Sequence, residues 1–321
     1  MAHQFRNVDA DGINIRVAVE GDGPLVLFVH GFPESWYSWR HQMKALSAAG
    51  FTAAAMDVRG YGGSDKPEPV EAYDMQSIAS DVAAVARALQ PDGPAVVVGH
   101  DWGAPIAWNS ALLHPDQFKA VAGLSVPYMP QGEIVQLDAA REFFRGRDLF
   151  FYQLYFQEEG VAEAELEADP AATIRRFYYA ISGDAPDGTW PTDKKFNDTL
   201  LHRLPEPDMP LPWLDEDDVE YYASQFRESG FRGPLNRYRN SHRDNAYLRA
   251  SGDQVIHQPS LFIGGTKDLV LKMAPFDMVE TMKRYLSDLR GAYMLDGCGH
   301  WTQQECPDEV NALLIDWLAR L

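Results

Sequence analysis

Short apolar runs alternate with segments of helical periodicity through the first 126 residues, and this alternation limits the possible folds more than any other feature of the sequence. The helical patterns lie at residues 39–49, 75–89 and 103–114. The apolar runs before, between and after them are Leu25–His30, Thr52–Asp57, Ala95–His100 and Ala120–Val126. Continuous apolar runs are typical of strands buried on both faces, and parallel strands need crossover helices. We therefore predict an α/β fold whose central sheet is mostly parallel and is flanked by helices on both faces.

The strand pattern is interrupted in the middle of the chain. It stops at Pro127 and Pro130 and resumes only at Ser260–Gly264 and Ala292–Leu295, before a last helix near residues 308–321. The intervening stretch is rich in aromatic residues and has acidic helical runs. We predict that residues 1–126 and 254–321 form one core, opened by a β-hairpin over residues 5–20. Residues 127–253 are expected to form a mainly helical cap over the carboxyl ends of the strands, where open α/β sheets bind ligands.

Composition and charge argue against several classes of partner. The formal net charge is −19, so the surface repels phosphate backbones and anionic membranes, and we expect neither nucleic acid nor a membrane as a partner. No apolar run approaches the ~20 residues of a membrane span. The first 15 residues are polar and acidic, unlike a signal peptide, and the only two cysteines, Cys298 and Cys306, are expected to be free thiols. We therefore predict a cytoplasmic protein. The sequence leaves open whether it forms a homo-oligomer.

The strongest chemical signal is Gly99-His100-Asp101-Trp102-Gly103, which lies between a predicted strand and a predicted helix. Small residues two before and two after a central polar residue are the spacing of a nucleophile elbow. The central Asp101 is ionised at neutral pH and needs no base to act as a nucleophile. The alternative is a tight turn whose aspartate only caps the following helix.

Two further motifs supply the partners of such a nucleophile. His30-Gly31-Phe32-Pro33 follows the first buried strand, and its Phe32 N–H is expected to form an oxyanion hole with the N–H of Trp102. We expect His30 itself to be a hydrogen-bonded core residue. Near the C-terminus, Asp268 and His300 each follow a predicted strand. Asp268 would orient the His300 imidazole, which would activate a water molecule.

These motifs belong to a larger set that runs along the chain. The set comprises HGFPESWYSWR (30–40), DVRGYGGSD (57–65), GHDWGAPIAW (99–108), FYQLYFQEEG (151–160), GFRGPLN (230–236) and CGHWTQQECP (298–307). With this set the chain resembles the soluble epoxide hydrolases of the α/β-hydrolase superfamily over nearly its whole length. The resemblance implies the α/β-hydrolase fold and the hydrolysis of an epoxide to a vicinal diol.

The resemblance also implies that two cap tyrosines hold the epoxide oxygen, and these fall on Tyr152 and Tyr238, with Tyr155 a weaker candidate. A phenol can donate a hydrogen bond to the oxygen while the C–O bond breaks. Gln153 is implied as a substrate-binding residue beside Tyr152, together with the oxyanion-hole residues. Arg237 stands where relatives often have an aromatic residue, and this departure bears on the shape of the pocket.

The expected reaction has two steps, attack of Asp101 on an epoxide carbon and hydrolysis of the resulting ester by water that the His300–Asp268 pair activates. The expected partners are a small apolar epoxide and water. No metal or organic cofactor is expected, because HExxH and cysteine-rich ligand sets are absent from the sequence. A haloalkane dehalogenase is the alternative enzyme: Trp102 fits it, while Phe32 and the tyrosine motifs count against it. A non-catalytic ligand-binding member of the superfamily is a second alternative, against which the intact triad argues.

Overall fold

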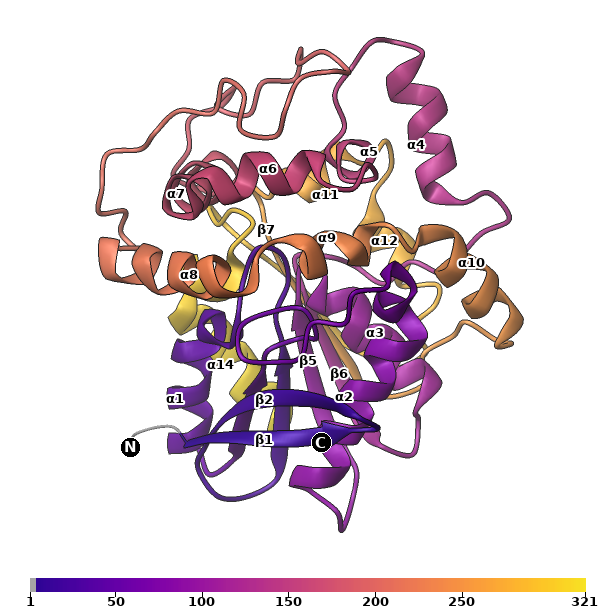
Figure 1. Ribbon diagram of the computed structural model, residues 1–321. Coiled ribbons are helices and arrows are strands. Elements are labelled where there is room, and N and C mark those ends of the chain that lie inside the picture. The colour runs from indigo at the N-terminus through magenta and orange to yellow at the C-terminus, as the bar shows by residue number, and fades with distance from the viewer. Residues whose placement is uncertain (1–3) are drawn as a thin grey trace.

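The computed structural model describes residues 4–321 and has a single eight-stranded sheet at its centre (Figure 1). The strand order is β1-β2-β4-β3-β5-β6-β7-β8. β1 and β2 form an antiparallel hairpin, β2 is antiparallel to β4, and the other neighbours are parallel. The strands are β1 Gln4–Ala10, β2 Ile13–Glu20, β3 Leu25–Val29, β4 Thr52–Met56, β5 Ala95–His100, β6 Phe118–Leu124, β7 Ser260–Gly265 and β8 Leu289–Leu295.

The predicted α/β fold and its mostly parallel sheet are confirmed, and two strands, β6 and β8, differ from their predicted bounds by more than one residue. β6 ends at Leu124, two residues earlier than predicted, because Ser125 has a φ of 65° and turns the chain out of the sheet. β8 begins three residues earlier than predicted, at Leu289. It is an edge strand whose residues are only partly buried, so its first half lacks an apolar pattern.

Helices cover both faces of the sheet. β3 shows why, because its residues belong alternately to two apolar clusters: Leu25, Leu27 and Val29 face one, and Val26 and Phe28 face the other. One face is covered by α1 and α14, and the other by α2 and α3. Their bounds are α1 Arg40–Ala48, α2 Met75–Leu89, α3 Gly103–Leu113 and α14 Pro307–Leu318, with shorter helices η1 Trp36–Trp39, η2 Val70–Tyr73, α11 Leu269–Met273, α12 Met278–Met282 and α13 Thr302–Glu305.

Between β6 and β7 the chain forms helices and loops outside the sheet, and Figure 1 shows α6 to α9 lying across one end of it. The long loop of residues 181–215 separates α7 from α8. Tyr178 of α7 donates to the carbonyl oxygen of Pro33, after β3, at 2.9 Å. Residues 127–253 are therefore proposed to be a cap inserted between core segments 1–126 and 254–321. Its helices are α4 Gln136–Arg145, α5 Tyr152–Tyr155, α6 Val161–Ala168, α7 Pro170–Ala180, α8 Glu216–Ser229, α9 Arg232–Tyr238 and α10 Ser241–Ala250.

The described residues bear on two expectations about the surroundings of the protein. Among residues 4–321, no helix combines the length and apolarity needed to cross a bilayer. Both cysteines are free thiols, Cys298 buried and Cys306 partly exposed. Residues 1–3, the beginning of the polar N-terminal segment, lie outside the described residues.

Candidate active site

Asp101 lies at the tight turn between β5 and α3. Its φ of 50° falls in the left-handed region, which residues other than glycine seldom adopt. A Cβ on Gly99 would lie 1.9 Å from the carbonyl oxygen of Gly103, and a Cβ on Gly103 would lie 2.0 Å from that of Val29. Only glycine fits at these two positions without displacing the backbone. The turn therefore has the geometry of a nucleophile elbow, with the Asp101 side chain beside the loop that follows β3.

The structure brings together the three residues of the predicted triad. The Oδ2 of Asp101 lies 3.3 Å from Nε2 of His300. On the other side of the ring, Nδ1 of His300 lies 3.1 Å and 3.2 Å from the two carboxylate oxygens of Asp268. Asp268 follows β7 and is fully buried, and His300, which follows β8, is 1% exposed. The imidazole is therefore fixed between two carboxylates and out of bulk water.

The electrostatics of the triad keep Asp101 ionised. Burial alone would raise the pKa of its carboxyl, but the hydrogen bond and the charge of His300 outweigh burial, so that the pKa lies below its ordinary value. Burial alone would likewise lower the pKa of His300, yet Asp268 and Asp101 raise it well above its ordinary value. The resting pair is thus a carboxylate and an imidazolium.

One carboxylate oxygen of Asp101 is bound by one of the two N–H groups that are expected to form the oxyanion hole. The N–H of Phe32 donates to Oδ1 of Asp101 at 2.7 Å. The second expected donor, the N–H of Trp102, lies at the N-cap of α3. His30 is buried below this loop, where its Nε2 accepts from the N–H of Val58 at 3.1 Å and its Nδ1 lies 2.9 Å from the carbonyl oxygen of Gly31. It is a hydrogen-bonded core histidine, as expected.

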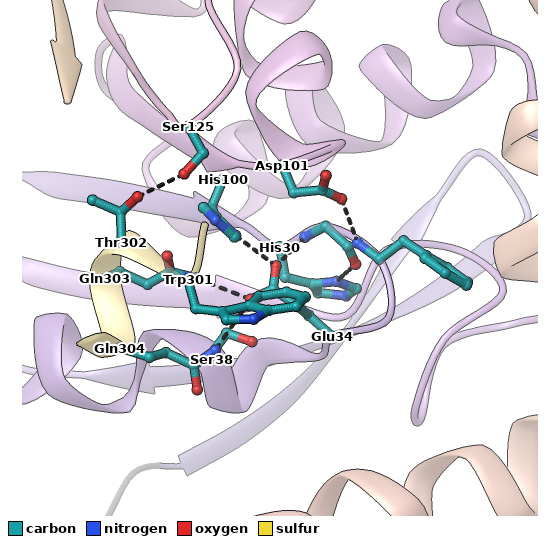
Figure 2. Close-up of polar contacts among 12 residues, drawn as sticks. His30, Glu34, Ser38, His100, Asp101, Ser125, Trp301, Thr302, Gln303 and Gln304 are labelled. Atoms are coloured by element: carbon teal, nitrogen blue, oxygen red, sulfur yellow. Dashed lines mark hydrogen bonds and ion pairs between the residues drawn. The ribbon is translucent and has the colours of Figure 1, made fainter. Parts of the chain in front are cut away.

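A buried carboxylate, Glu34, connects the three catalytic loops (Figure 2). Its Oε2 accepts from the N–H of Gly31 at 2.7 Å and lies 2.9 Å from Nδ1 of His100. The Nε2 of His100 lies 2.7 Å from the carbonyl oxygen of His300. The two ring nitrogens of His100 thus lie against one carboxylate oxygen and one carbonyl oxygen. Glu34 thus joins the oxyanion-hole loop, the nucleophile elbow and the backbone of the catalytic histidine.

Further hydrogen bonds complete this network. Oε1 of Glu34 accepts from Gln303 at 3.0 Å and from Gln304 at 3.4 Å. The hydroxyl of Ser125 donates to the carbonyl oxygen of His300 at 2.7 Å. Burial acts to raise the pKa of the Glu34 carboxyl, but the neighbouring His100 lowers it by more. The pKa of Glu34 therefore lies below its ordinary value. Glu34 was not predicted as a site residue from the sequence; the available signal was a charged residue in the apolar and aromatic segment that follows β3, where a buried charge requires partners.

The two cap tyrosines lie together above the nucleophile. The rings of Tyr152 and Tyr238 are 6.0 Å apart, and Tyr238 also packs edge-on against Trp102 at 5.2 Å and Phe32 at 5.5 Å. Burial raises the pKa of both phenols, so they remain protonated donors at neutral pH. The hydroxyl of Tyr152 accepts from the side-chain amide of Gln153 at 3.0 Å, which leaves its own proton free to be donated.

Tyr155 takes a different place. Its hydroxyl donates to Oε2 of Glu165 at 2.9 Å within the cap. Tyr152, Gln153 and Trp102 instead line a cavity of about 210 Å³ that has Asp101 in its wall. A substrate in this cavity would contact the nucleophile and the first tyrosine together. Within residues 4–321, no cluster of three or more histidine, cysteine or acidic side chains could hold a metal ion.

Comparison with known proteins agrees with this geometry. The family described as alpha/beta hydrolase fold matches residues 24–306. Epoxide hydrolase A of Mycobacterium tuberculosis is 42% identical, over 98% of this chain and 97% of that protein. The chain belongs to the epoxide hydrolases of the α/β-hydrolase fold. An epoxide hydrolase from an endophytic Streptomyces has a structure that superposes with a TM-score of 0.92 at 47% identity, covering 99% of this chain and 96% of that one.

A longer epoxide hydrolase is also similar. Bifunctional epoxide hydrolase 2 of Rattus norvegicus is 40% identical over 96% of this chain, which spans 54% of the rat protein. The similarity to epoxide hydrolases therefore extends over core and cap segments alike, in agreement with the placement of the two tyrosines above the elbow.

Proposed function

We propose that this epoxide hydrolase converts its substrate to a vicinal diol through a covalent ester on Asp101. One observation carries the proposal: the carboxylate of Asp101 is bonded on one oxygen by Phe32 N–H and on the other by His300, and the phenols of Tyr152 and Tyr238 lie close to each other beside it. A carboxylate in this place is a nucleophile, and phenols across from it are suited to an oxygen that gains charge.

The first step is attack on an epoxide carbon. Oδ1 of Asp101 already accepts from the N–H of Phe32, so Oδ2 is the oxygen that forms the new C–O bond. The epoxide C–O bond breaks at the same carbon, and its electron pair goes to the epoxide oxygen. Tyr152 and Tyr238 donate hydrogen bonds to that oxygen as it gains charge. Oδ1 becomes the carbonyl oxygen of the ester and stays in the oxyanion hole.

The second step is hydrolysis of the ester. Esterification removes the negative charge that lay 3.3 Å from Nε2 of His300 and helped to keep the ring protonated. The pKa of His300 therefore falls when the ester forms, and the proton that it loses neutralises the alkoxide left by the first step. The neutral imidazole, held by Asp268, then takes a proton from water. The hydroxide attacks the ester carbonyl carbon, and the oxyanion is stabilised by the N–H groups of Phe32 and Trp102. When this intermediate collapses, the bond between the carbonyl carbon and Oδ2 breaks, the diol departs with Oδ2, and its oxygen takes the proton of the new Asp101 carboxyl group.

The haloalkane dehalogenase alternative has less support. Trp102 follows the nucleophile in both classes, but the side chain of Phe32 offers no donor to a halide ion. The two phenols have no task in halide release, whereas an epoxide oxygen requires them.

Activity assays separate these functions. The purified protein should convert styrene oxide to its diol and release no bromide from a bromoalkane. Bromide release without diol formation would favour the dehalogenase, and neither activity would favour a non-catalytic ligand-binding protein. In His300→Gln, mass spectrometry should find the mass of one whole epoxide on the peptide that contains Asp101, because the first step does not need the base.

We also propose the setting in which this chemistry takes place. A small apolar epoxide and water are the proposed partners, and the surface, with a formal net charge of −19, supports a cytoplasmic protein that binds neither nucleic acid nor anionic membranes. Fractionation of cells that express the native chain, with diol formation assayed in each fraction, tests this location.

A further inference from the structure

The loop that carries His300 is bound by an acidic side chain, Glu305, to which the proposed reaction gives no task. Glu305 is the last residue of α13 and is partly buried. Its Oε2 accepts from the N–H of Gly299 at 2.8 Å, and its Oε1 accepts from the N–H of Trp301 at 2.9 Å. One carboxylate therefore binds the backbone on both sides of the catalytic histidine.

The same carboxylate also binds the segment that follows α7. Oε2 of Glu305 accepts from the N–H of Gly183 at 2.8 Å, and the N–H of His300 donates to the carbonyl oxygen of Ile181 at 3.1 Å. The two backbones are in direct contact, because a Cβ on Gly299 would lie 2.1 Å from the backbone nitrogen of Gly183. The loop of the base is thus fixed against the proposed cap.

Glu305 and Glu34 act on different parts of the site. Glu34 binds the oxyanion-hole loop and the nucleophile elbow, both of which are used in each chemical step. The three hydrogen bonds that Glu305 accepts come instead from the loop of the base and from Gly183. Loss of these bonds displaces His300, which the second step needs as a base, and leaves the contacts of the first-step nucleophile, Asp101, with the oxyanion-hole loop in place.

We propose that Glu305 is a positioning residue for the base, which holds the His300 imidazole where it can take a proton from the water that attacks the ester. Asp268 orients the ring itself, and Glu305 fixes the backbone from which the ring extends. A base must lie within hydrogen-bond reach of the proton that it takes, and a displacement of about 1 Å can cost about 100-fold in rate. This inference rests on the proposed two-step reaction and assigns a residue outside the triad to its second step.

The test variant is Glu305→Gln, which keeps the size of the side chain. Its amide offers one oxygen in place of two, and its NH2 group would face at least one of the three N–H groups that the carboxylate now binds. Glu305→Asp is the second variant, should the first fail to fold, because its carboxylate is one methylene group short of the same donors. The control is Glu309→Gln on α14, which changes an exposed carboxylate.

The readout is the ratio of two rates, measured in single turnovers of styrene oxide with enzyme in excess. Mass spectrometry of the peptide that contains Asp101 follows the ester, and chromatography follows the diol. In Glu305→Gln we expect ester hydrolysis to slow about 10- to 100-fold and ester formation to change less than about 3-fold, so that the ester accumulates. A side chain that only stabilises the fold would lower the amount of active enzyme and leave this ratio unchanged. Glu309→Gln should match the wild type.

A further variant separates the loop of the base from the proposed cap. Nζ of Lys267 donates to the carbonyl oxygen of Gly183 at 2.7 Å. Lys267→Met removes this bond and keeps all three bonds to Glu305, so the ratio of the two rates should stay as in the wild type. Equal slowing of ester hydrolysis in Lys267→Met would assign the effect to the docking of the cap and overturn the role of Glu305.

An unchanged ratio in folded Glu305→Gln would also overturn the proposal and leave epoxide hydrolysis intact, and so would slowing of both steps by the same factor. A wild type that forms no diol would instead count against the proposed function itself.

Discussion

Removal of the Glu34 carboxylate should weaken both the fold and the catalysis. In Glu34→Ala the four hydrogen bonds that this side chain accepts are lost, and Nδ1 of His100 loses its partner in a buried site. Breaking a buried charge pair by removing one partner costs about 3–5 kcal/mol. We therefore expect the free energy of unfolding to fall by roughly that amount.

The effect on catalysis follows from which loops Glu34 connects. The N–H of Gly31 fixes the loop that carries Phe32, and His100 fixes the carbonyl of His300. Displacement of catalytic groups by about 1 Å can cost about 100-fold in rate, and both chemical steps use these loops. Ester formation and ester hydrolysis should therefore both slow, which distinguishes Glu34→Ala from the loss of a tyrosine or of the base.

Urea unfolding followed by tryptophan fluorescence measures the first effect, and single-turnover kinetics measures the second. Glu228→Ala on α8, an exposed carboxylate, is the matched control and should change neither. The pKa of Glu34 is depressed in the folded protein, so its stabilisation is present above the ordinary value near 4.5 and is lost as pH falls through the folded pKa. Equal unfolding midpoints and equal rates in wild type and Glu34→Ala at pH 7 would show that Glu34 neither stabilises the fold nor positions the catalytic loops.

Three further outcomes are expected. Tyr152→Phe and Tyr238→Phe should each slow ester formation about 10- to 1000-fold and leave ester hydrolysis nearly unchanged in pre-steady-state traces; slowed hydrolysis alone would remove the tyrosines from this role. Gly99→Ala should abolish activity, because its Cβ would lie 1.9 Å from the carbonyl oxygen of Gly103, while Gly93→Ala, with nothing within 4 Å, should be neutral in the same diol assay. The rate of ester decay should fall with decreasing pH through a pKa below that of His300 in the free enzyme, since the ester lacks the Asp101 charge; a higher pKa in stopped-flow pH profiles would contradict this.

The strands in the middle of the sheet could be predicted from the sequence, because burial on both faces gives them a continuous apolar pattern. The runs that became β3 to β5 are almost wholly buried, so nearly all of their residues are apolar and their bounds could be predicted to within one residue. β8 lies at the edge of the sheet and is only partly buried, so its beginning carried no such signal. The short helices α11 to α13 contain too few turns for a periodic pattern.

The candidate site likewise contains residues that the sequence predicted and contacts that it did not. Asp101, Asp268 and His300 each follow a strand, so their order along the chain sufficed to predict that they meet. The partners of Arg237 did not follow any local pattern, because the carbonyl of Tyr73 is 164 residues away in the sequence and belongs to the core segment. Glu34 was equally hidden, since Gln303 and Gln304 lie near the other end of the chain. Long-range polar contacts of this kind require the folded structure.

A single turnover of the wild-type enzyme in oxygen-18 water, with enzyme in excess over the epoxide, distinguishes attack by Asp101 from direct attack by water. If Asp101 is the nucleophile, the diol takes one oxygen from the epoxide and one from Asp101, while water replaces the oxygen that the carboxylate lost. The diol of the first turnover should then contain no label, and peptide mass spectrometry should find oxygen-18 in Asp101. A labelled first-turnover diol with an unlabelled Asp101 would mean that water attacks the epoxide directly, and it would contradict the covalent ester.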